Sequence, residues 1–237
     1  DITGDGMKDK IRIRAANQTD DEAYSSLTVS VNGKTAYRLK NTRFYNVIVN
    51  IYTLKNGQPF LYLYAPAENG DGPVCALLKY TNGKFRKALD FTEIMAGYGD
   101  HRIGEVTNLN GNKIVITESI VSYSLGINAI NFTYEYVNGK FVPTSRYGSY
   151  KEIYSADGSS RYFTVNSDLP TYTRPDATAV NTTLKTGSLT KIIKCALING
   201  KMYIQLECDG EIYWIKALEN PPIADNERQF MEVRYAG

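Results

Sequence analysis

The chain has 237 residues, and its 27 Lys and Arg residues against 25 Asp and Glu residues leave a formal charge of +2. This length allows one large domain or two modest ones, and the near-neutral charge excludes the strong positive field that attracts nucleic acids or anionic membranes. A single His and three Cys exclude a His-rich zinc site, a zinc ribbon and a disulfide framework. No apolar run approaches the roughly 18 residues of a transmembrane helix, so we expect no membrane insertion.

The first nine residues place oxygen-bearing side chains at alternate positions and turn sharply at Gly6. Calcium takes six to eight oxygen ligands, and a loop of this kind supplies several of them to one ion. The predicted ligands are the side chains of Asp1, Thr3, Asp5 and Asp9 and the carbonyl of Met7.

This loop resembles the calcium-binding Asp-x-Asp/Asn-x-Asp-Gly-x-x-Asp loop of integrin-type and related bacterial extracellular propeller repeats. The resemblance implies a Ca²⁺ cofactor and a strand directly after the loop. Thr3 departs from the family pattern, in which Asp or Asn is usual, and Arg12 stands where an EF-hand has its bidentate Glu. The alternative is a turn without an ion, because the sequence Thr-Gly-Asp-Gly is also typical of turns.

Four Asn-Gly-Lys sequences predict two-residue hairpin turns, because Asn-Gly accepts positive φ at both central positions. They begin at Asn32, Asn82, Asn138 and Asn199. The spacings are 50, 56 and 61 residues (32 to 82, 82 to 138, 138 to 199). A period near 50 is typical of repeated four-stranded units such as propeller blades.

The segments that flank these turns are rich in Ile, Val, Tyr, Phe and Thr, or alternate between apolar and polar residues, so they are predicted strands. They comprise residues 10–15, 27–31, 46–54, 59–64, 113–118 and 128–137. Only residues 90–96 predict a short helical turn. The fold class is therefore all-β.

Three Asn-Gly-Lys units lie upstream of Tyr150 and a loop-like segment begins at Gly148, so we predict a domain boundary near Tyr150. We expect propeller-like or sandwich-like antiparallel sheets in residues 1–150, a linker in 151–160, and a small barrel in 161–219. Residues 220–237 form a tail whose end, 229–235, is a possible strand that pairs back onto the body. Three units of about 50 residues are too few to close a propeller ring, so an open or sandwich-like stack is expected unless upstream sequence is missing.

The C-terminal module has five short predicted strands separated by Pro, Gly and Asn-Gly breaks. Its motifs are Leu169-Pro170-Thr171-Tyr172, Leu184-Lys185-Thr186-Gly187 and Tyr213-Trp214-Ile215. This pattern resembles a bacterial SH3-like domain, although Tyr213 stands where that family prefers Gly. The resemblance implies a module that binds cell-wall peptidoglycan or acts as a non-catalytic spacer.

Aromatic side chains in this module are the candidate ligand-binding residues, because aromatic faces offer large contact area at low entropic cost. They are Tyr172, Tyr203, Tyr213 and Trp214. The alternative is that these rings fill the barrel core.

No catalytic constellation is evident. Cys75 lies in an apolar strand-like run without the helix N-terminus that would activate a thiol beside His101, and the Asp-Cys-Ser signature of cell-wall cysteine peptidases is absent. Carboxylates cluster near the predicted helical turn, where a solvated polar stretch explains them. These are Asp90, Glu93, Asp100 and Glu105.

The hairpin at Asn199 places Cys195 opposite Ile204 and Cys208 opposite Lys191. The two thiols then lie about 13 Å apart along the strand, too far for a disulfide.

These observations predict a non-catalytic bacterial protein, secreted or at the cell surface, that recognises cell-wall peptidoglycan or another glycan. The chain begins at Asp1 rather than Met, and we expect a leader to be absent from it. The alternatives are a cell-wall hydrolase or hydrolase accessory subunit, whose catalytic carboxylates need not be close in sequence, and a structural spacer or protein-interaction module. No nucleic-acid partner is expected, and the sequence does not fix an oligomeric state.

Overall fold

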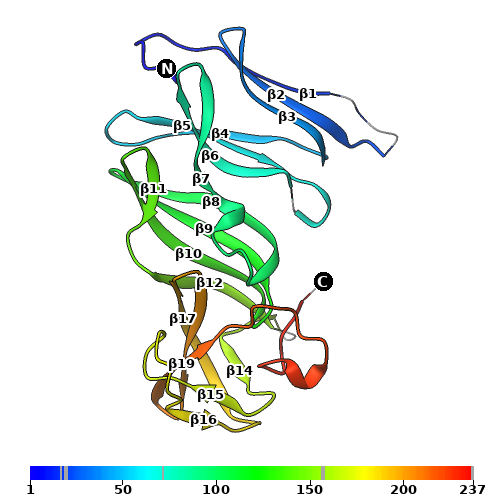
Figure 1. The fold of residues 1–237 in the computed structure, drawn as a ribbon, viewed down its shortest axis with the longest axis vertical. Helices are drawn as coiled ribbons and strands as arrows, with labels where there is room; N and C mark the ends of the chain where they lie inside the picture. Colours follow the sequence, from blue (N-terminus) through cyan, green and yellow to red (C-terminus); the bar gives the residue numbers. More distant parts are fainter. Residues whose placement is uncertain (17, 19–20, 71, 156–157, 236–237) are drawn as a thin grey trace. The chain divides into compact units, whose positions relative to one another are not determined.

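The computed structural model describes residues 1–16, 18, 21–70, 72–155 and 158–235 (Figure 1). These residues form antiparallel sheets, which confirms the all-β prediction. Helical structure in this part of the chain is limited to three short 3₁₀ turns: η1 (Glu68–Gly70), η2 (Phe91–Glu93) and η3 (Asp225–Glu227). Among the described residues, no helix has the length and apolar character needed to cross a membrane.

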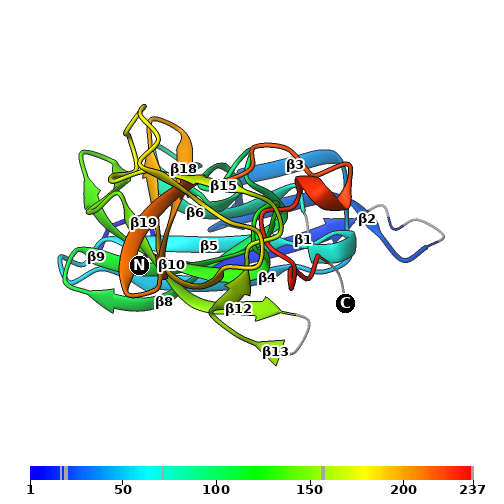
Figure 2. The same cartoon turned by 90° about the horizontal axis from the view of Figure 1, so that it is seen from below.

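The first sheet is a three-stranded meander of β1 (Ile11–Ala16), β2 (Tyr24–Val31) and β3 (Lys34–Phe44). The three strands lie side by side in chain order (Figure 1 and Figure 2). Apolar and polar residues alternate along β2, and its alternate residues from Leu27 to Val31 are buried. Since successive strand residues point to opposite faces, one face of this sheet is apolar and the other polar.

The second sheet contains the next four strands in chain order. They are β4 (Ile48–Thr53), β5 (Pro59–Ala65), β6 (Val74–Thr81) and β7 (Lys84–Asp90). Its Leu61, Leu63 and Leu78 pack with Leu27 and Val29 of the first sheet in one buried cluster. The first two sheets therefore form a two-layered sandwich around a shared apolar core.

The opposite face of β5 carries an aromatic cluster. The Phe60 ring centroid lies 4.9 Å from the centroids of both Tyr136 and Phe141. Tyr62 contacts the ring of Phe91, which is fully buried at the start of η2. The η2 turn replaces the longer helical turn predicted for residues 90–96, and Asp90 caps it by accepting a hydrogen bond from the Thr92 amide.

A third sheet contains ten strands, of which seven run in the order β19-β18-β17-β12-β10-β9-β8. These seven are β8 (Gly99–Asn110), β9 (Lys113–Ser122), β10 (Gly126–Val137), β12 (Tyr147–Ser155), β17 (Leu189–Ile198), β18 (Lys201–Cys208) and β19 (Glu211–Lys216). Three short strands attach to them: β11 (Lys140–Pro143) pairs with β10, β13 (Gly158–Ser159) with β12, and β14 (Tyr162–Thr164) with β17.

A separate two-stranded sheet pairs β15 (Leu169–Thr171) with β16 (Thr182–Leu184). It is joined to β19 by an isolated bridge in which Tyr172 and Trp214 exchange backbone hydrogen bonds of 2.7 and 2.9 Å.

The four predicted Asn-Gly turns are present. At each turn both residues have positive φ, from 50° to 52° at the Asn and from 72° to 90° at the Gly. The same geometry occurs at Asp209-Gly210 between β18 and β19. Positive φ at both positions gives the turn a twist that matches that of the flanking strands, so each turn fixes the register of its hairpin.

Backbone contacts divide the chain into two compact units, and the boundary between them does not fall at residue 150. Unit 1 comprises Asp1–Ile94, Asn108–Ile114 and Glu135–Val142, and unit 2 comprises Met95–Thr107, Val115–Tyr134 and Pro143–Gly237. Tyr150 lies inside β12, and the segment predicted as a linker contains the end of β12 and β13.

The C-terminal tail pairs back onto unit 2 without forming a regular strand. Phe230 bridges Val165, the Met231 amide donates to the Thr164 carbonyl at 3.0 Å, and the Ile127 amide donates to the Arg234 carbonyl at 2.9 Å. The predicted pairing is therefore made by isolated bridges.

Candidate functional site

The acidic loop at the start of the chain is held together by its own backbone. The Asp1 carboxylate accepts hydrogen bonds from the amides of Gly4 at 2.6 Å, Asp5 at 3.2 Å and Gly6 at 2.7 Å. Gly4 and Gly6 have φ of 82° and 84°, in the left-handed region that favours glycine. The two glycines thus allow the chain to wrap around the Asp1 side chain.

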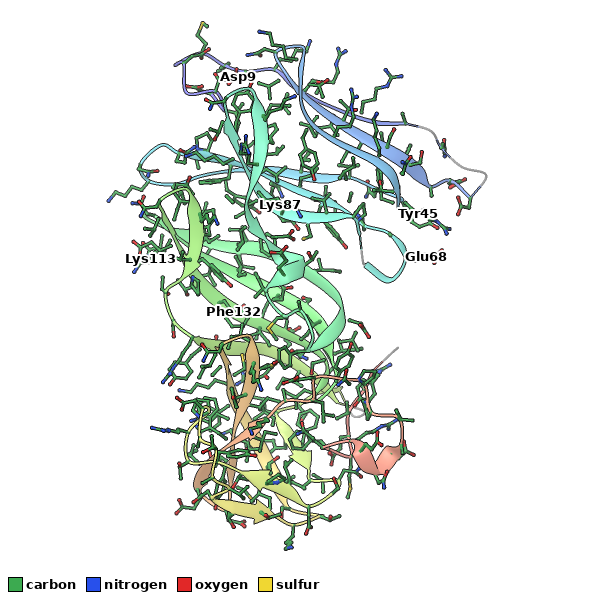
Figure 3. The ribbon with its side chains drawn as sticks, viewed as in Figure 1. Asp9, Tyr45, Glu68, Lys87, Lys113 and Phe132 are labelled. Carbon is green, nitrogen blue, oxygen red and sulfur yellow. The ribbon has the colours of Figure 1, made fainter. Side chains whose placement is uncertain are left out.

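Asp9 closes the loop from the other end, beside the first sheet (Figure 3). Its carboxylate accepts from the amides of Thr3 at 2.9 Å and Ile2 at 2.7 Å, and from the side-chain amide of Asn32 at 2.5 Å. These donors, the Thr3 amide first, stabilise the ionised carboxylate and hold the pKa of Asp9 below its ordinary value.

Three oxygens of the predicted calcium ligands lie close together. Thr3 Oγ1 is 3.4 Å from Asp1 Oδ1 and 3.3 Å from Asp9 Oδ1. Oxygens that bind one Ca²⁺ at about 2.3–2.6 Å and at right angles are separated by about 3.3–3.7 Å. The spacing of these three oxygens therefore suits neighbouring ligands of one ion.

Asp5 and Met7 are linked to each other, because the Asp5 carboxylate accepts from the Met7 amide at 2.9 Å. In the part of the chain that the structure describes, no group of three or more His, Cys, Asp or Glu side chains is gathered closely enough to hold a metal ion. The loop therefore brings Asp1, Thr3 and Asp9 together and leaves Asp5 on its own backbone turn.

The aromatic residues predicted to bind a ligand pack mainly against one another. Tyr172, Tyr203 and Trp214 form a buried cluster with Ala196, and their exposed fractions are 7%, 7% and 5%. Tyr213 of β19 pairs with Leu206 of β18 and is half-buried. Three of these four side chains thus offer little surface to a ligand.

A hollow of about 290 Å³ in unit 2 lies next to this cluster, and we call it the Tyr147 hollow. Such a volume lies just below the roughly 300–1,000 Å³ range of small-molecule sites. Its lining residues are Val115, Asn131, Thr133, Ser145, Tyr147, Gly148, Ser149 and Lys194.

Three polar side chains of the hollow form a row across three neighbouring strands. Asn131 of β10 pairs with Ser149 of β12, and Ser149 pairs with Lys194 of β17. Directly paired residues project to the same face of a sheet, so an amide, a hydroxyl and an ammonium group stand next to one another. Thr117 of β9 donates to Asn131 Oδ1 at 2.7 Å, which orients the Asn131 amide group.

The half-buried ring of Tyr147 forms one side of the hollow. Lys194 Nζ lies 4.5 Å from its centroid, and Arg146 Cζ lies 5.2 Å from it. The buried Trp214 ring has its centroid 6.0 Å from that of Tyr147. Tyr172, Tyr203 and Trp214, which the sequence predicts to bind a ligand, therefore pack beside Tyr147 on the same part of the sheet, and two cations lie next to the Tyr147 ring.

Gly148 allows β12 to lie close to its neighbour. A Cβ at this position would stand 2.5 Å from Cε1 of Phe132 and 2.7 Å from Cγ2 of Ile130. Phe132, labelled in Figure 3, is a buried residue of β10. The absence of a side chain at Gly148 therefore leaves room for the side chains of Phe132 and Ile130 on the face opposite the polar row.

The lining residues of the hollow include no carboxylate, thiol or imidazole. It can hydrogen-bond and attract an anionic group, but its own side chains supply no carboxylate pair for acid–base hydrolysis.

The environment of the three thiols does not favour nucleophilic catalysis either. Cys75, Cys195 and Cys208 are buried thiols outside any disulfide, and desolvation raises the pKa of Cys195 to about 12. The side chain of His101 lies outside the described residues. In the hairpin, Cys195 faces Ile204 as predicted, whereas Lys191 pairs with Glu207 because a bulge between Ile192 and Lys194 shifts the register by one residue.

The sequence does not single out the residues of the hollow. Alternation along residues 128–137 places Asn131 and Thr133 on one strand face, and Tyr147 and Ser149 are also two residues apart. No local pattern, however, indicates that β10 and β17 lie on opposite edges of β12. That arrangement depends on pairing between distant segments.

Comparison with known proteins gives no relative. No protein-family description matches the chain, and neither a curated protein nor a solved structure is significantly similar to it.

Proposed function

We propose that this chain is a non-catalytic binding protein of the bacterial exterior, secreted or at the cell surface, and that it recognises a glycan, with cell-wall peptidoglycan as the first candidate. The observation that carries the proposal is the row of Asn131, Ser149 and Lys194 beside the Tyr147 ring. The sequence resemblances to an SH3-like module and to extracellular calcium loops point to the same setting.

Each group in the hollow has a counterpart in peptidoglycan. Sugar hydroxyls and acetamido groups donate and accept hydrogen bonds, as do the side chains of Asn131 and Ser149. The carboxylates of peptidoglycan would pair with Lys194, whose ammonium is held near the sheet surface by the Tyr147 ring. A polar ligand of low charge density therefore fits this site better than an apolar one.

The non-catalytic assignment is supported by the chemistry of the lining. Hydrolysis of a glycosidic bond generally requires two carboxyl groups that flank the bond, one as an acid and the other as a nucleophile or base. The Tyr147 hollow contributes neither. A cell-wall hydrolase or accessory subunit remains the second candidate, and a spacer or protein-interaction module the third.

Binding to purified, insoluble peptidoglycan tests the proposal. The combined variant Tyr147→Ala, Lys194→Gln should bind at least about tenfold more weakly than the unmodified chain, because it removes the ring and the cation together. A matched control is Tyr162→Ala, Lys191→Gln, which removes another tyrosine–lysine pair that also includes a β17 lysine, with Lys191 Nζ 6.0 Å from the Tyr162 ring centroid. This control should bind normally.

The same experiment separates the alternatives. Release of soluble fragments from the peptidoglycan would contradict the non-catalytic assignment and favour the hydrolase. Absence of sedimentation with peptidoglycan and with other insoluble glycans would favour the spacer. Equal losses in the two variants would exclude the Tyr147 hollow as the binding site.

We also propose that the N-terminal loop binds Ca²⁺ through Asp1, Thr3 and Asp9, with Asp5 and the Met7 carbonyl completing the ligand set. Extracellular calcium modules bind with dissociation constants of about 10⁻⁴–10⁻³ M, so calcium at a hundred times that constant stabilises the folded state by about 2.7 kcal/mol. Thermal unfolding with calcium and with a chelator measures this. Identical midpoints would show that the loop is a turn without an ion.

A further inference from the structure

The first sheet has a charge composition unlike that of the whole chain. Its three strands contain six basic residues and no acidic residue. The six are Arg12, Arg14, Lys34, Arg38, Lys40 and Arg43. The near-neutral total of the chain therefore conceals one strongly cationic sheet.

Four of these cations project from the polar face of the sheet. Strand pairing places Arg14, Thr28 and Arg38 in one row across β1, β2 and β3. Lys40 pairs with Ser26 in the next row on the same face. The opposite face carries Leu27 and Val29 and is buried in the sandwich core, so the cationic face is the one turned to solvent.

Arg12 extends the same face along β1, where it pairs with Ser30. We call the surface formed by Arg12, Arg14, Arg38, Lys40 and the hydroxyl groups between them the basic face. It contains a hollow of about 330 Å³. The lining residues of that hollow are Ser25, Ser26, Thr28, Arg38, Lys40 and Asn41.

In the part of the chain that the structure describes, the charges of the basic face are not neutralised by ion pairs. Arg43 differs, because it forms ion pairs with Asp21 and Glu68, the latter at 3.3 Å. Within the described residues, no ion pair is found for the four cations of the basic face, and all four are exposed. These side chains are available to an external anion.

The spacing of the cations favours a polymer over a small ion. Arg12 and Arg14 stand about 7 Å apart along β1, and Arg14 and Arg38 about 10 Å apart across two strand spacings. One small anion cannot contact all of these groups at once, whereas a chain with repeated anionic groups can.

The groups between the cations indicate which polymer. They are the hydroxyls of Ser26, Thr28 and Ser30, which suit sugar hydroxyls, and no aromatic side chain lies in these rows on which a nucleic-acid base could stack. We propose that the basic face binds an acidic polysaccharide with regularly spaced carboxylate or sulfate groups. This proposal concerns unit 1 and does not depend on the Tyr147 hollow in unit 2.

The test uses the full chain with a sulfated and a carboxylated polysaccharide, heparin and polygalacturonate, at roughly 0.05 M salt, where charge attraction is weakly screened. The variant Arg14→Gln, Arg38→Gln should bind both at least about tenfold more weakly. The control Lys55→Gln, Lys113→Gln removes two exposed charges from hairpin residues of the same unit and should bind within about twofold of the unmodified chain. Unchanged thermal midpoints verify that all three proteins are folded.

Further measurements complete the test of the basic face. Affinity should fall steeply as salt rises, and neutral dextran should not bind. Equal losses in the two variants, or no binding to either acidic polysaccharide, would overturn the proposal. Tighter binding of single-stranded DNA than of both polysaccharides would overturn the assignment of the ligand as a glycan.

Discussion

Gly148 controls the contact between two strands that hold the Tyr147 hollow. A side chain at this position would be directed into the buried ring of Phe132 and the methyl group of Ile130, both less than 3 Å away. Neighbouring Ser149 lies on the other face and is exposed. An added methyl group at Gly148 should therefore affect stability much more than removal of the hydroxyl group of Ser149.

We predict that Gly148→Ala lowers the free energy of unfolding by about 1–3 kcal/mol, because the added methyl group overpacks the contact with Phe132. Ser149→Ala should change it by less than about 0.5 kcal/mol. Chemical denaturation of the two variants measures the difference. Similar stabilities for both would contradict the close packing of β12 on β10.

The burial of the cysteines leads to a second prediction, which concerns the reactivity of their thiols. Burial raises the pKa of Cys195 to about 12, so its thiol stays protonated, and therefore unreactive, until the pH approaches that value. Cys75 and Cys208 are 1% and 4% exposed. In the native protein at about pH 9, a thiol reagent should therefore modify none of the three, and all three should react in denaturant. Rapid modification of Cys75 in the folded state would contradict this and revive the thiol–imidazole hypothesis.

At the scale of elements, the C-terminal tail acts as part of the core of unit 2. Phe230 is fully buried with its ring centroid 5.7 Å from that of Phe163, whereas the adjacent Met231 is 48% exposed. The amide and hydroxyl of Thr164 both donate to the Glu232 carboxylate, at 2.7 and 2.5 Å. The tail is thus fixed by packing and by side-chain hydrogen bonds instead of by a strand ladder.

We predict that Phe230→Ala destabilises the protein by about 3–5 kcal/mol, the usual cost of removing a buried aromatic ring. Met231→Ala, one residue away, should cost less than about 0.5 kcal/mol. Equilibrium unfolding of both variants provides the comparison. Equal effects would mean that the tail is not anchored through Phe230.

The sequence predicts the hairpin turns between strands, but it does not predict irregularities in strand pairing. Asn32, Asn82, Asn138 and Asn199 identify their hairpins correctly because turn geometry depends on two adjacent residues. The bulge at Ile193 has no such local marker, and it moved the partner of Lys191 by one residue.

The row of Asn131, Ser149 and Lys194 could not be predicted from the sequence either, because two strand pairings bring these residues together from distant parts of the chain. Burial of the rings predicted to bind a ligand was likewise decided by long-range packing. Trp214 and Tyr172 are brought together by a bridge between β19 and the segment after β15.

At the scale of the whole molecule, total charge is a poor guide to local charge. The formal charge of +2 excludes a strong overall field, yet the strands of the first sheet contain basic residues without acidic ones. Acidic residues are concentrated elsewhere, as in the N-terminal loop. Because exposed charges separated by more than about 8 Å are largely screened at physiological salt, each surface interacts with ligands according to its own composition.

The central claim is that the Tyr147 hollow binds a peptidoglycan fragment without cleaving it, and the only tryptophan of the chain reports on that event. The Trp214 ring centroid lies 6.0 Å from that of Tyr147, which lines the hollow. Titration with soluble peptidoglycan fragments should change the tryptophan fluorescence to saturation in the unmodified chain and much less in Tyr147→Ala, and mass spectrometry should recover the fragments intact. Unchanged fluorescence at saturating fragment, an equal response from Tyr147→Ala, or cleaved fragments would contradict the claim.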